Sequence, residues 1–164
     1  MRHLFLDCDG VLADFDCAAR QLFGMESRAA EEALGEKEFW RRIRLSGDFY
    51  RSLPLVHDAI DLYRAVAHLK PTILTGCPRG QWSQPQKIAW AHQHFPGVPV
   101  ITCASREKFR HVAHRGDVLV DDYLKYKTLW EEAGGVFVQH FAAKQSIKRL
   151  KELGFDVHMQ NRKG

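Results

Sequence analysis

Two acidic residues follow the first apolar run of the sequence. Residues 4–6 are apolar and lead directly into Asp7, and Asp9 and Gly10 follow. A short apolar run that stops at a turn signal is typical of a buried strand. Because Asp7 and Asp9 are two apart, their side chains leave an extended backbone on the same side. The pattern predicts a pair of carboxylates at the end of a core strand, although Asp and Gly are also common in plain turns.

Four further apolar runs also end at polar or reactive residues. They cover residues 72–76, 98–103, 116–122 and 135–140, and they finish at Thr75-Gly76, Thr102-Cys103, Asp121-Asp122 and Gln139-His140. In an open parallel sheet the carboxyl ends of the strands gather at one edge, where ligands bind. We therefore expect Asp7, Asp9, Thr75, Asp121 and Asp122 to converge, although they are far apart in the sequence.

The segments between these runs carry helical patterns. Apolar residues recur at helical spacing, or glycines and prolines mark helix ends, over residues 58–70, 81–95, 107–114, 123–133 and 142–154. Strands that alternate with helices predict an α/β fold with a parallel sheet covered on both faces. Residues 16–55 are predicted to form a small, mostly helical cap inserted into a core made of residues 1–15 and 56–164. This cap is too small to hold a core of its own and should lie over the main domain.

Composition restricts the class of protein. The chain has 164 residues, of which 45% are hydrophobic and 27% charged, and its formal net charge is +4. These values suit one globular domain and anionic small-molecule partners. No apolar run is long enough to span a bilayer or stands as a separate signal before the first strand, so we expect a cytoplasmic protein without a membrane partner. The cysteines show no C-x-x-C spacing, and Cys8, Cys77 and Cys103 are expected to be small buried apolar residues.

The expected cluster of carboxylates suggests a metal-dependent reaction. Four carboxylates in one crevice repel each other unless a cation lies among them. Ligands that are all oxygen favour Mg²⁺ over zinc, and Mg²⁺ held by carboxylates is the usual arrangement of phosphoryl-transfer sites. A carboxylate can then attack phosphorus to give an aspartyl-phosphate. The charges balance, because Mg²⁺ and one lysine match a phosphate dianion and one aspartate.

These residues resemble the haloacid dehalogenase (HAD) superfamily of phosphatases. Its four motifs appear in order as the DCDGV segment at residues 7–11, the Thr75-Gly76 strand end, a lysine before the fourth strand, and Asp121-Asp122. The resemblance implies a Rossmann-like core with strand order 5-4-1-2-3. It also implies that Asp7 is the nucleophile. Asp9 would protonate the leaving oxygen and then activate the water that hydrolyses the aspartyl-phosphate.

The resemblance also assigns the ligands. Mg²⁺ would be bound by Asp7, by the main-chain carbonyl of Asp9 and by the Asp121-Asp122 pair, and which of these two binds it directly is left open. Thr75 and the Gly76 amide would hold the phosphoryl oxygens. The lysine of the third motif should be Lys108, and Lys87 is its competitor because it also lies near the strand ends.

Within the superfamily, the DCDGVLADF segment and the helical cap look most like the 5′(3′)-deoxyribonucleotidases. There the residue that matches Phe15 contacts the base, and Phe39-Trp40 occupies a comparable place in the cap. Stacking of a base on Phe15 and Trp40 is physically reasonable, but these rings are equally suited to packing the cap. Arg79 either clamps a phosphate or faces solvent.

The predicted function is therefore a Mg²⁺-dependent, nucleotidase-like phosphatase that hydrolyses a small phosphomonoester, with a nucleoside monophosphate as the favoured substrate. One alternative is a polynucleotide 3′-phosphatase, for which the basic residues Arg41, Arg42 and Arg44 would contact nucleic acid. The other is a non-catalytic HAD-like protein that binds a nucleotide or a partner, which the presence of both Asp7 and Asp9 disfavours.

Overall fold

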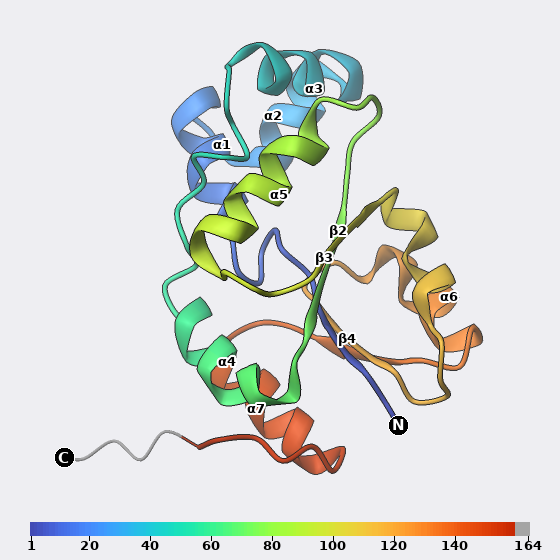
Figure 1. The fold of residues 1–164 in the computed structure, drawn as a ribbon. Helices are drawn as coiled ribbons and strands as arrows, with labels where there is room; N and C mark the ends of the chain where they lie inside the picture. The colour runs from blue at the N-terminus through green and yellow to red at the C-terminus, as the bar shows by residue number, and fades with distance from the viewer. Residues whose placement is uncertain (160–164) are drawn as a thin grey trace, which may run out of the picture.

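A five-stranded parallel sheet lies at the centre of the computed structural model, which describes residues 1–159 (Figure 1). Its strands are β1 (Leu4–Leu6), β2 (Thr72–Gly76), β3 (Val100–Cys103), β4 (Val118–Asp121) and β5 (Val136–Gln139). They lie in the order β3-β2-β1-β4-β5, and each neighbouring pair is parallel. This is the predicted order 5-4-1-2-3 counted from the other edge, so the predicted Rossmann-like α/β fold is confirmed.

The strand β1 lies in the middle of the sheet because it is apolar on both faces. Leu6 is fully buried on one face and Phe5 is 6% exposed on the other, and Leu6 lies beside Ile73 of β2 and Val120 of β4. The pairing continues one residue further, where the Asp7 N–H donates to the Val120 carbonyl at 2.9 Å. Asp7 therefore leaves the sheet from its centre, between the ends of two neighbouring strands.

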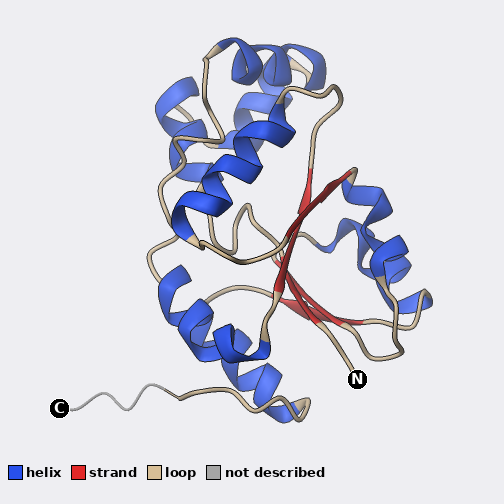
Figure 2. Cartoon of the chain, in the orientation of Figure 1, coloured by secondary structure: helices blue, strands red, loops and turns tan. Residues whose placement is uncertain are grey.

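Helices cover both faces of the sheet, but unequally (Figure 2). The helices α4 (Ala59–Val66), α5 (Ser83–His94) and α7 (Ala143–Glu152) lie on one face. The other face carries the short α6 (Lys127–Glu132) and the 3₁₀-helix η2 (Ser105–His111). Two further 3₁₀-turns, η1 (Ala67–Leu69) and η3 (Leu124–Tyr126), follow α4 and precede α6.

Two of the predicted helices are different in the structure. The helix expected over 107–114 is the 3₁₀-helix η2, and it ends early because the Asp117 carboxylate accepts the N–H groups of Ala113 and His114, both at 2.9 Å. The helix expected over 123–133 is η3 followed by α6. Its first turn is tightened where the Tyr123 N–H donates to the Asp121 carboxylate at 2.9 Å.

Three helices lie above the carboxyl ends of the strands (Figure 1). They are α1 (Phe15–Phe23), α2 (Ser27–Leu34) and α3 (Glu36–Leu45), and α1 begins where the Asp14 carboxylate accepts the Cys17 N–H at 3.0 Å. The buried residues Phe39 and Ile43 of α3 belong to the same apolar cluster as Leu6 of the sheet. The expected division into a cap at 16–55 and a core at 1–15 and 56–164 stays a prediction.

Burial of the cysteines differs from the expectation in part. Cys8 is 3% exposed, as expected, whereas Cys77 and Cys103 are only half-buried. Both lie at strand ends on the wall of a cavity, where side chains are not enclosed by the core. Over residues 1–159, no helix has the length and apolar character that crossing a bilayer requires.

Because the α3 side chains share their core with the sheet, the cap should unfold together with it. Ile43 is fully buried, so Ile43→Ala should lower the free energy of unfolding by about 2–5 kcal/mol in urea denaturation followed by circular dichroism. Leu45 is 67% exposed on the same helix, and Leu45→Ala should change it by less than about 0.5 kcal/mol. Equal effects of the two substitutions would show that α3 does not pack on the common core.

Candidate active site

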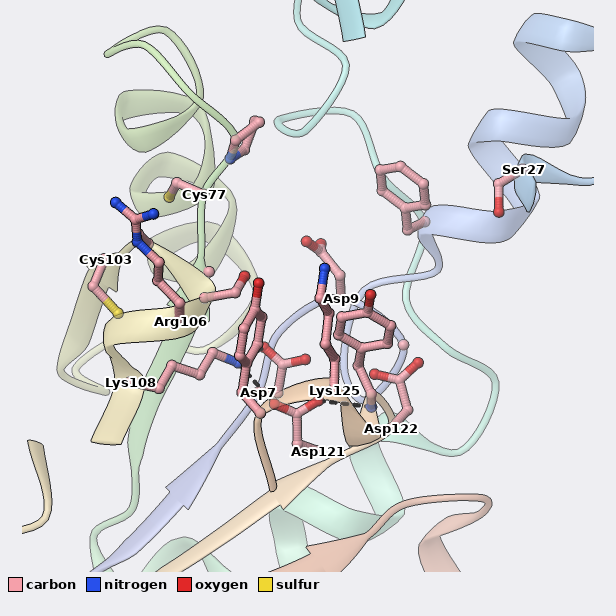
Figure 3. A pocket seen from close by; sticks show the side chains of 18 of the residues that line it. Asp7, Asp9, Ser27, Cys77, Cys103, Arg106, Lys108, Asp121, Asp122 and Lys125 are labelled. Carbon is pink, nitrogen blue, oxygen red and sulfur yellow. Dashed lines mark hydrogen bonds and ion pairs between the residues drawn. The ribbon is translucent and has the colours of Figure 1, made fainter. Parts of the chain in front are cut away.

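The ends of β1, β2 and β4 meet at a cavity of about 1560 Å³ beneath the cap (Figure 3). Asp7 follows β1, Gly76 ends β2, and Asp121 ends β4. The cavity wall contains nine of the ten residues predicted from the sequence to form the site, namely Asp7, Asp9, Phe15, Trp40, Gly76, Arg79, Lys108, Asp121 and Asp122. The expected convergence at one edge of the sheet is therefore present, and it joins core and cap residues.

Three carboxylates form a compact group in this cavity. One oxygen from each of Asp7, Asp121 and Asp122 lies within 4.8 Å of the other two. Burial raises the pKa of Asp121 and of Asp122 to about 7, and repulsion from Asp7 adds to the effect in both. The protein thus leaves part of this negative charge unbalanced. An all-oxygen donor set with excess negative charge fits a hard divalent cation such as Mg²⁺.

Gly10 allows the third of these carboxylates, Asp122, to approach the turn that follows β1. Its φ is +81°, a left-handed conformation that favours glycine, and a Cβ placed on it would lie within 2.1 Å of the nearer Asp122 carboxylate oxygen. The backbone can therefore turn away after Asp9 while the Asp122 carboxylate packs against the Gly10 Cα. The glycine brings Asp122 close to Asp7, although the two belong to different strand ends.

Lys108 lies between two of the carboxylates. It comes from η2, and its Nζ donates to Asp7 Oδ1 at 2.8 Å and to Asp121 Oδ2 at 2.9 Å (Figure 3). Burial alone would lower the pKa of this ammonium group, but the two carboxylates outweigh burial and raise it. Lys108 therefore stays charged and lines the cavity beside the predicted nucleophile.

Lys87, the other candidate for the third-motif lysine, contacts a different acid. It comes from α5, is 2% exposed, and its Nζ donates to Asp9 Oδ2 at 2.6 Å. It also contacts the Thr75 hydroxyl at 3.1 Å and the Gly76 carbonyl at 2.7 Å. Asp9 points its side chain toward this lysine and does not belong to the group of three carboxylates, as expected if only its main chain binds a metal.

Thr75 is the one predicted site residue outside the cavity wall. It is 1% exposed, and its hydroxyl is engaged by Lys87. Of the two residues at this strand end, Gly76 is the one that reaches the cavity. The contact of Thr75 with a phosphoryl group therefore stays a prediction.

Aromatic side chains form the cap side of the cavity. The rings of Phe15 and Trp40 both line it, with their centroids 6.1 Å apart, and both are half-buried. Phe39 is 2% exposed and packs edge-on against Trp40 at 5.1 Å. Phe15 and Trp40 thus pack the cap and also present ring surface to the cavity, so both roles left open by the sequence are compatible with the structure.

Some cavity residues gave little signal in the sequence. Ser105, Arg106 and Lys125 line the same wall as the exposed Arg79. Ser105 and Arg106 come two and three residues after the end of β3. Their position near a strand end is the one feature of the sequence that could have indicated a place in the site. Lys125 lies in η3, which was expected to be the start of a regular helix, and its direction was not predictable from periodicity.

No protein-family model and no curated protein matches this sequence. Solved structures do match its fold. The HAD-hydrolase YfnB of Bacillus subtilis, solved bound to magnesium, has a TM-score of 0.59 at 12% identity, covering 94% of this chain and 99% of that one. A HAD-superfamily hydrolase from Ehrlichia chaffeensis has a TM-score of 0.57 at 11% identity, covering 93% of this chain and 98% of that one.

A third similar structure is named as a dehalogenase and not as a phosphatase. The L-2-haloacid dehalogenase of Xanthobacter autotrophicus has a TM-score of 0.57 at 14% identity, covering 94% of this chain and 84% of that one. At such low identities the likeness establishes the fold and leaves the reaction open. The chain has the fold of the HAD-superfamily hydrolases.

Proposed function

We propose that this protein is a Mg²⁺-dependent phosphomonoester hydrolase that forms an aspartyl-phosphate on Asp7. The observation that carries the proposal is the grouping of Asp7 with Lys108, Asp121 and Asp122, in which a lysine and a divalent cation can together cancel the charge of the three carboxylates so that a phosphate can approach Asp7. Mg²⁺ held by Asp7, the Asp9 carbonyl and the Asp121-Asp122 pair would supply charge neutralisation at the transferring phosphoryl group.

The side chains divide the reaction into two steps. The Asp7 carboxylate attacks phosphorus while the bond to the leaving oxygen breaks, and that oxygen takes a proton from Asp9. Asp9 then removes a proton from a water, which attacks phosphorus and releases phosphate and the free Asp7 carboxylate. Lys108 and the Gly76 N–H would hold phosphoryl oxygens during both steps.

The same residues argue against a dehalogenase. A halide ion leaves carbon without needing a proton, so Asp9 would have no leaving group to protonate in that reaction. A group of three carboxylates would also repel a haloacid anion unless a metal neutralised it. Phosphoryl transfer uses both features.

The cap favours a substrate with a flat apolar part. Phe15 and Trp40 line the cavity from the cap helices α1 and α3, and a nucleobase stacks well on such rings. A nucleoside monophosphate would offer its phosphate to the carboxylates and its base to these rings. The polynucleotide alternative is less favoured, because Arg41 and Arg42 are engaged with Glu38 at 2.7 and 3.0 Å.

Replacing the nucleophile should abolish turnover. Asp7→Asn should lower phosphate release from nucleoside 5′- and 3′-monophosphates at least about 1,000-fold, and a chelator should do the same to the unsubstituted protein. Asp61→Asn, on the exposed side of α4, is the matched control and should remain fully active. Full activity of Asp7→Asn would rule out the covalent mechanism, and nucleotide binding without any turnover would favour the non-catalytic alternative.

Crowding at Gly10 should weaken metal binding. Gly10→Ala places a methyl group against the Asp122 carboxylate, so the Mg²⁺ concentration that gives half of the thermal stabilisation should rise about 10-fold or more. Gly97→Ala is the matched control, because Gly97 has a similar φ of +82° with nothing within 4 Å. If both variants bind Mg²⁺ as the unsubstituted protein does, Asp122 has no part in the metal site.

Metal affinity should rise with pH across neutrality. Because the pKa values of Asp121 and Asp122 are raised to about 7, protons compete with Mg²⁺ below pH 7 and are lost above it. The affinity should fall by up to about tenfold per pH unit below pH 7 for each carboxylate that must lose a proton. Thermal shifts by Mg²⁺ at pH 6 and pH 8 measure this, and an affinity independent of pH would contradict it.

A further inference from the structure

We infer that Lys87 is a positioning residue that holds the Asp9 side chain in place for proton transfer and does not itself contact the substrate. The inference rests on the proposed function, since it concerns the acid and base of that reaction. It gives a role to Lys87, which competed with Lys108 for the place of the third-motif lysine.

The hydrogen bonds of the two lysines differ in number. A lysine ammonium has three donors. Those of Lys87 are all taken, by Asp9 Oδ2 at 2.6 Å, the Thr75 hydroxyl at 3.1 Å and the Gly76 carbonyl at 2.7 Å. Lys108 has two acceptors within residues 1–159, Asp7 and Asp121, which leaves one N–H for a substrate oxygen. Lys108 can therefore bind substrate directly, and Lys87 cannot without losing a buried bond.

Location separates the two lysines in the same way. Lys108 lines the cavity, whereas Lys87 is 2% exposed and lies behind Asp9, whose own side chain is 26% exposed. A buried ammonium group that is fully hydrogen-bonded fixes the groups around it, because leaving any of them unpaired is costly. The group that Lys87 shares with the cavity is the Asp9 carboxylate.

An aromatic ring closes the remaining side of this lysine. The Nζ lies 4.3 Å from the centroid of the Tyr50 ring, a cation–π distance, and Tyr50 is 2% exposed. The Tyr50 N–H donates to the side chain of Gln86, the residue before Lys87, at 2.9 Å. Tyr50 also lies beside the cap residue Phe15, with ring centroids 6.1 Å apart. The chain that returns from the cap thus holds Lys87 in place.

The consequence for Asp9 is that its two oxygens differ. Oδ2 is bound to Lys87, while Oδ1 is buried and has no hydrogen-bond partner within residues 1–159. A buried carboxylate oxygen without a partner is unfavourable until a donor arrives. Holding Oδ2 thus fixes the orientation of the whole Asp9 carboxylate, which is 26% exposed and exchanges the proton with the leaving group or the attacking water.

Leaving groups of different acidity test this role. An alkoxide needs a proton to leave, whereas p-nitrophenolate does not, and kcat/KM reports the step in which the leaving group departs. Lys87→Met should therefore lower kcat/KM for a nucleoside 5′-monophosphate about 100-fold more than for p-nitrophenyl phosphate. Asp9→Asn should show the same difference between the two substrates, and adding Lys87→Met to Asp9→Asn should not change it further.

Control variants separate positioning from general damage. Lys108→Met should lower kcat/KM for both substrates alike, and Lys144→Met, exposed on α7, should lower neither. Tyr50→Leu removes only the ring and should produce a several-fold difference between the substrates in the same direction as Lys87→Met. It serves as the test if Lys87→Met does not fold, and in that case equal losses on both substrates with Tyr50→Leu would overturn the inference.

Each outcome has one meaning. Equal losses on both substrates in a folded Lys87→Met protein, or no loss, would show that Lys87 only stabilises the fold. An unsubstituted protein that hydrolyses neither substrate would instead refute the proposed function, and the inference with it. A difference between the two substrates in the Asp9, Lys87 and Tyr50 variants, and none in the Lys108 and Lys144 variants, would support both.

Discussion

Repulsion between carboxylates gathered at one edge of the sheet is the constraint that the site has to satisfy. The parallel sheet brings Asp7, Asp9, Asp121 and Asp122 to one edge, and burial there raises the pKa values of Asp9, Asp121 and Asp122. The structure meets this constraint with two lysines that reach the acids from opposite faces of the sheet. Lys87 comes from α5 on one face, and Lys108 comes from η2 on the other (Figure 1). The strand ends are thus held between two cations as well as by the hydrogen bonds of the sheet.

The two lysines leave the acids unequally compensated, which separates their tasks. Asp9 has a buried lysine of its own, and Asp7 shares Lys108 with Asp121. Asp122 has no lysine within salt-bridge distance among the described residues and packs against the Gly10 Cα. One end of the group is therefore suited to moving protons and the other to holding a cation. This asymmetry arises from the elements that carry the two lysines, α5 and η2, and from Gly10.

The sequence was sufficient to predict the sheet, its strand order and the meeting of the acids, because these follow from apolar runs and from the geometry of parallel strands. It was not sufficient for the helices on the second face, where hydrogen bonds to Asp117 and Asp121 decide how tightly η2 and η3 wind. The sequence also could not predict which carboxylate Lys87 and Lys108 each contact. Lys87 follows β2 and Lys108 follows β3 in the sequence. The position of each helix on the sheet decides which carboxylate its lysine reaches. The half-exposed state of Cys77 and Cys103 has the same origin, since it depends on the cavity beside them.

The charge of the site also explains the basic residues around it. Four carboxylates and two lysines leave two negative charges, which one divalent cation would cancel. A phosphate dianion entering that neutral site would need further cations, and Arg79, Arg106 and Lys125 line the same wall of the cavity. None of these three forms an ion pair with a carboxylate of residues 1–159. Lys87 and Lys108 balance the acids of the protein, so attraction of an anionic substrate falls to these exposed side chains of the cavity wall.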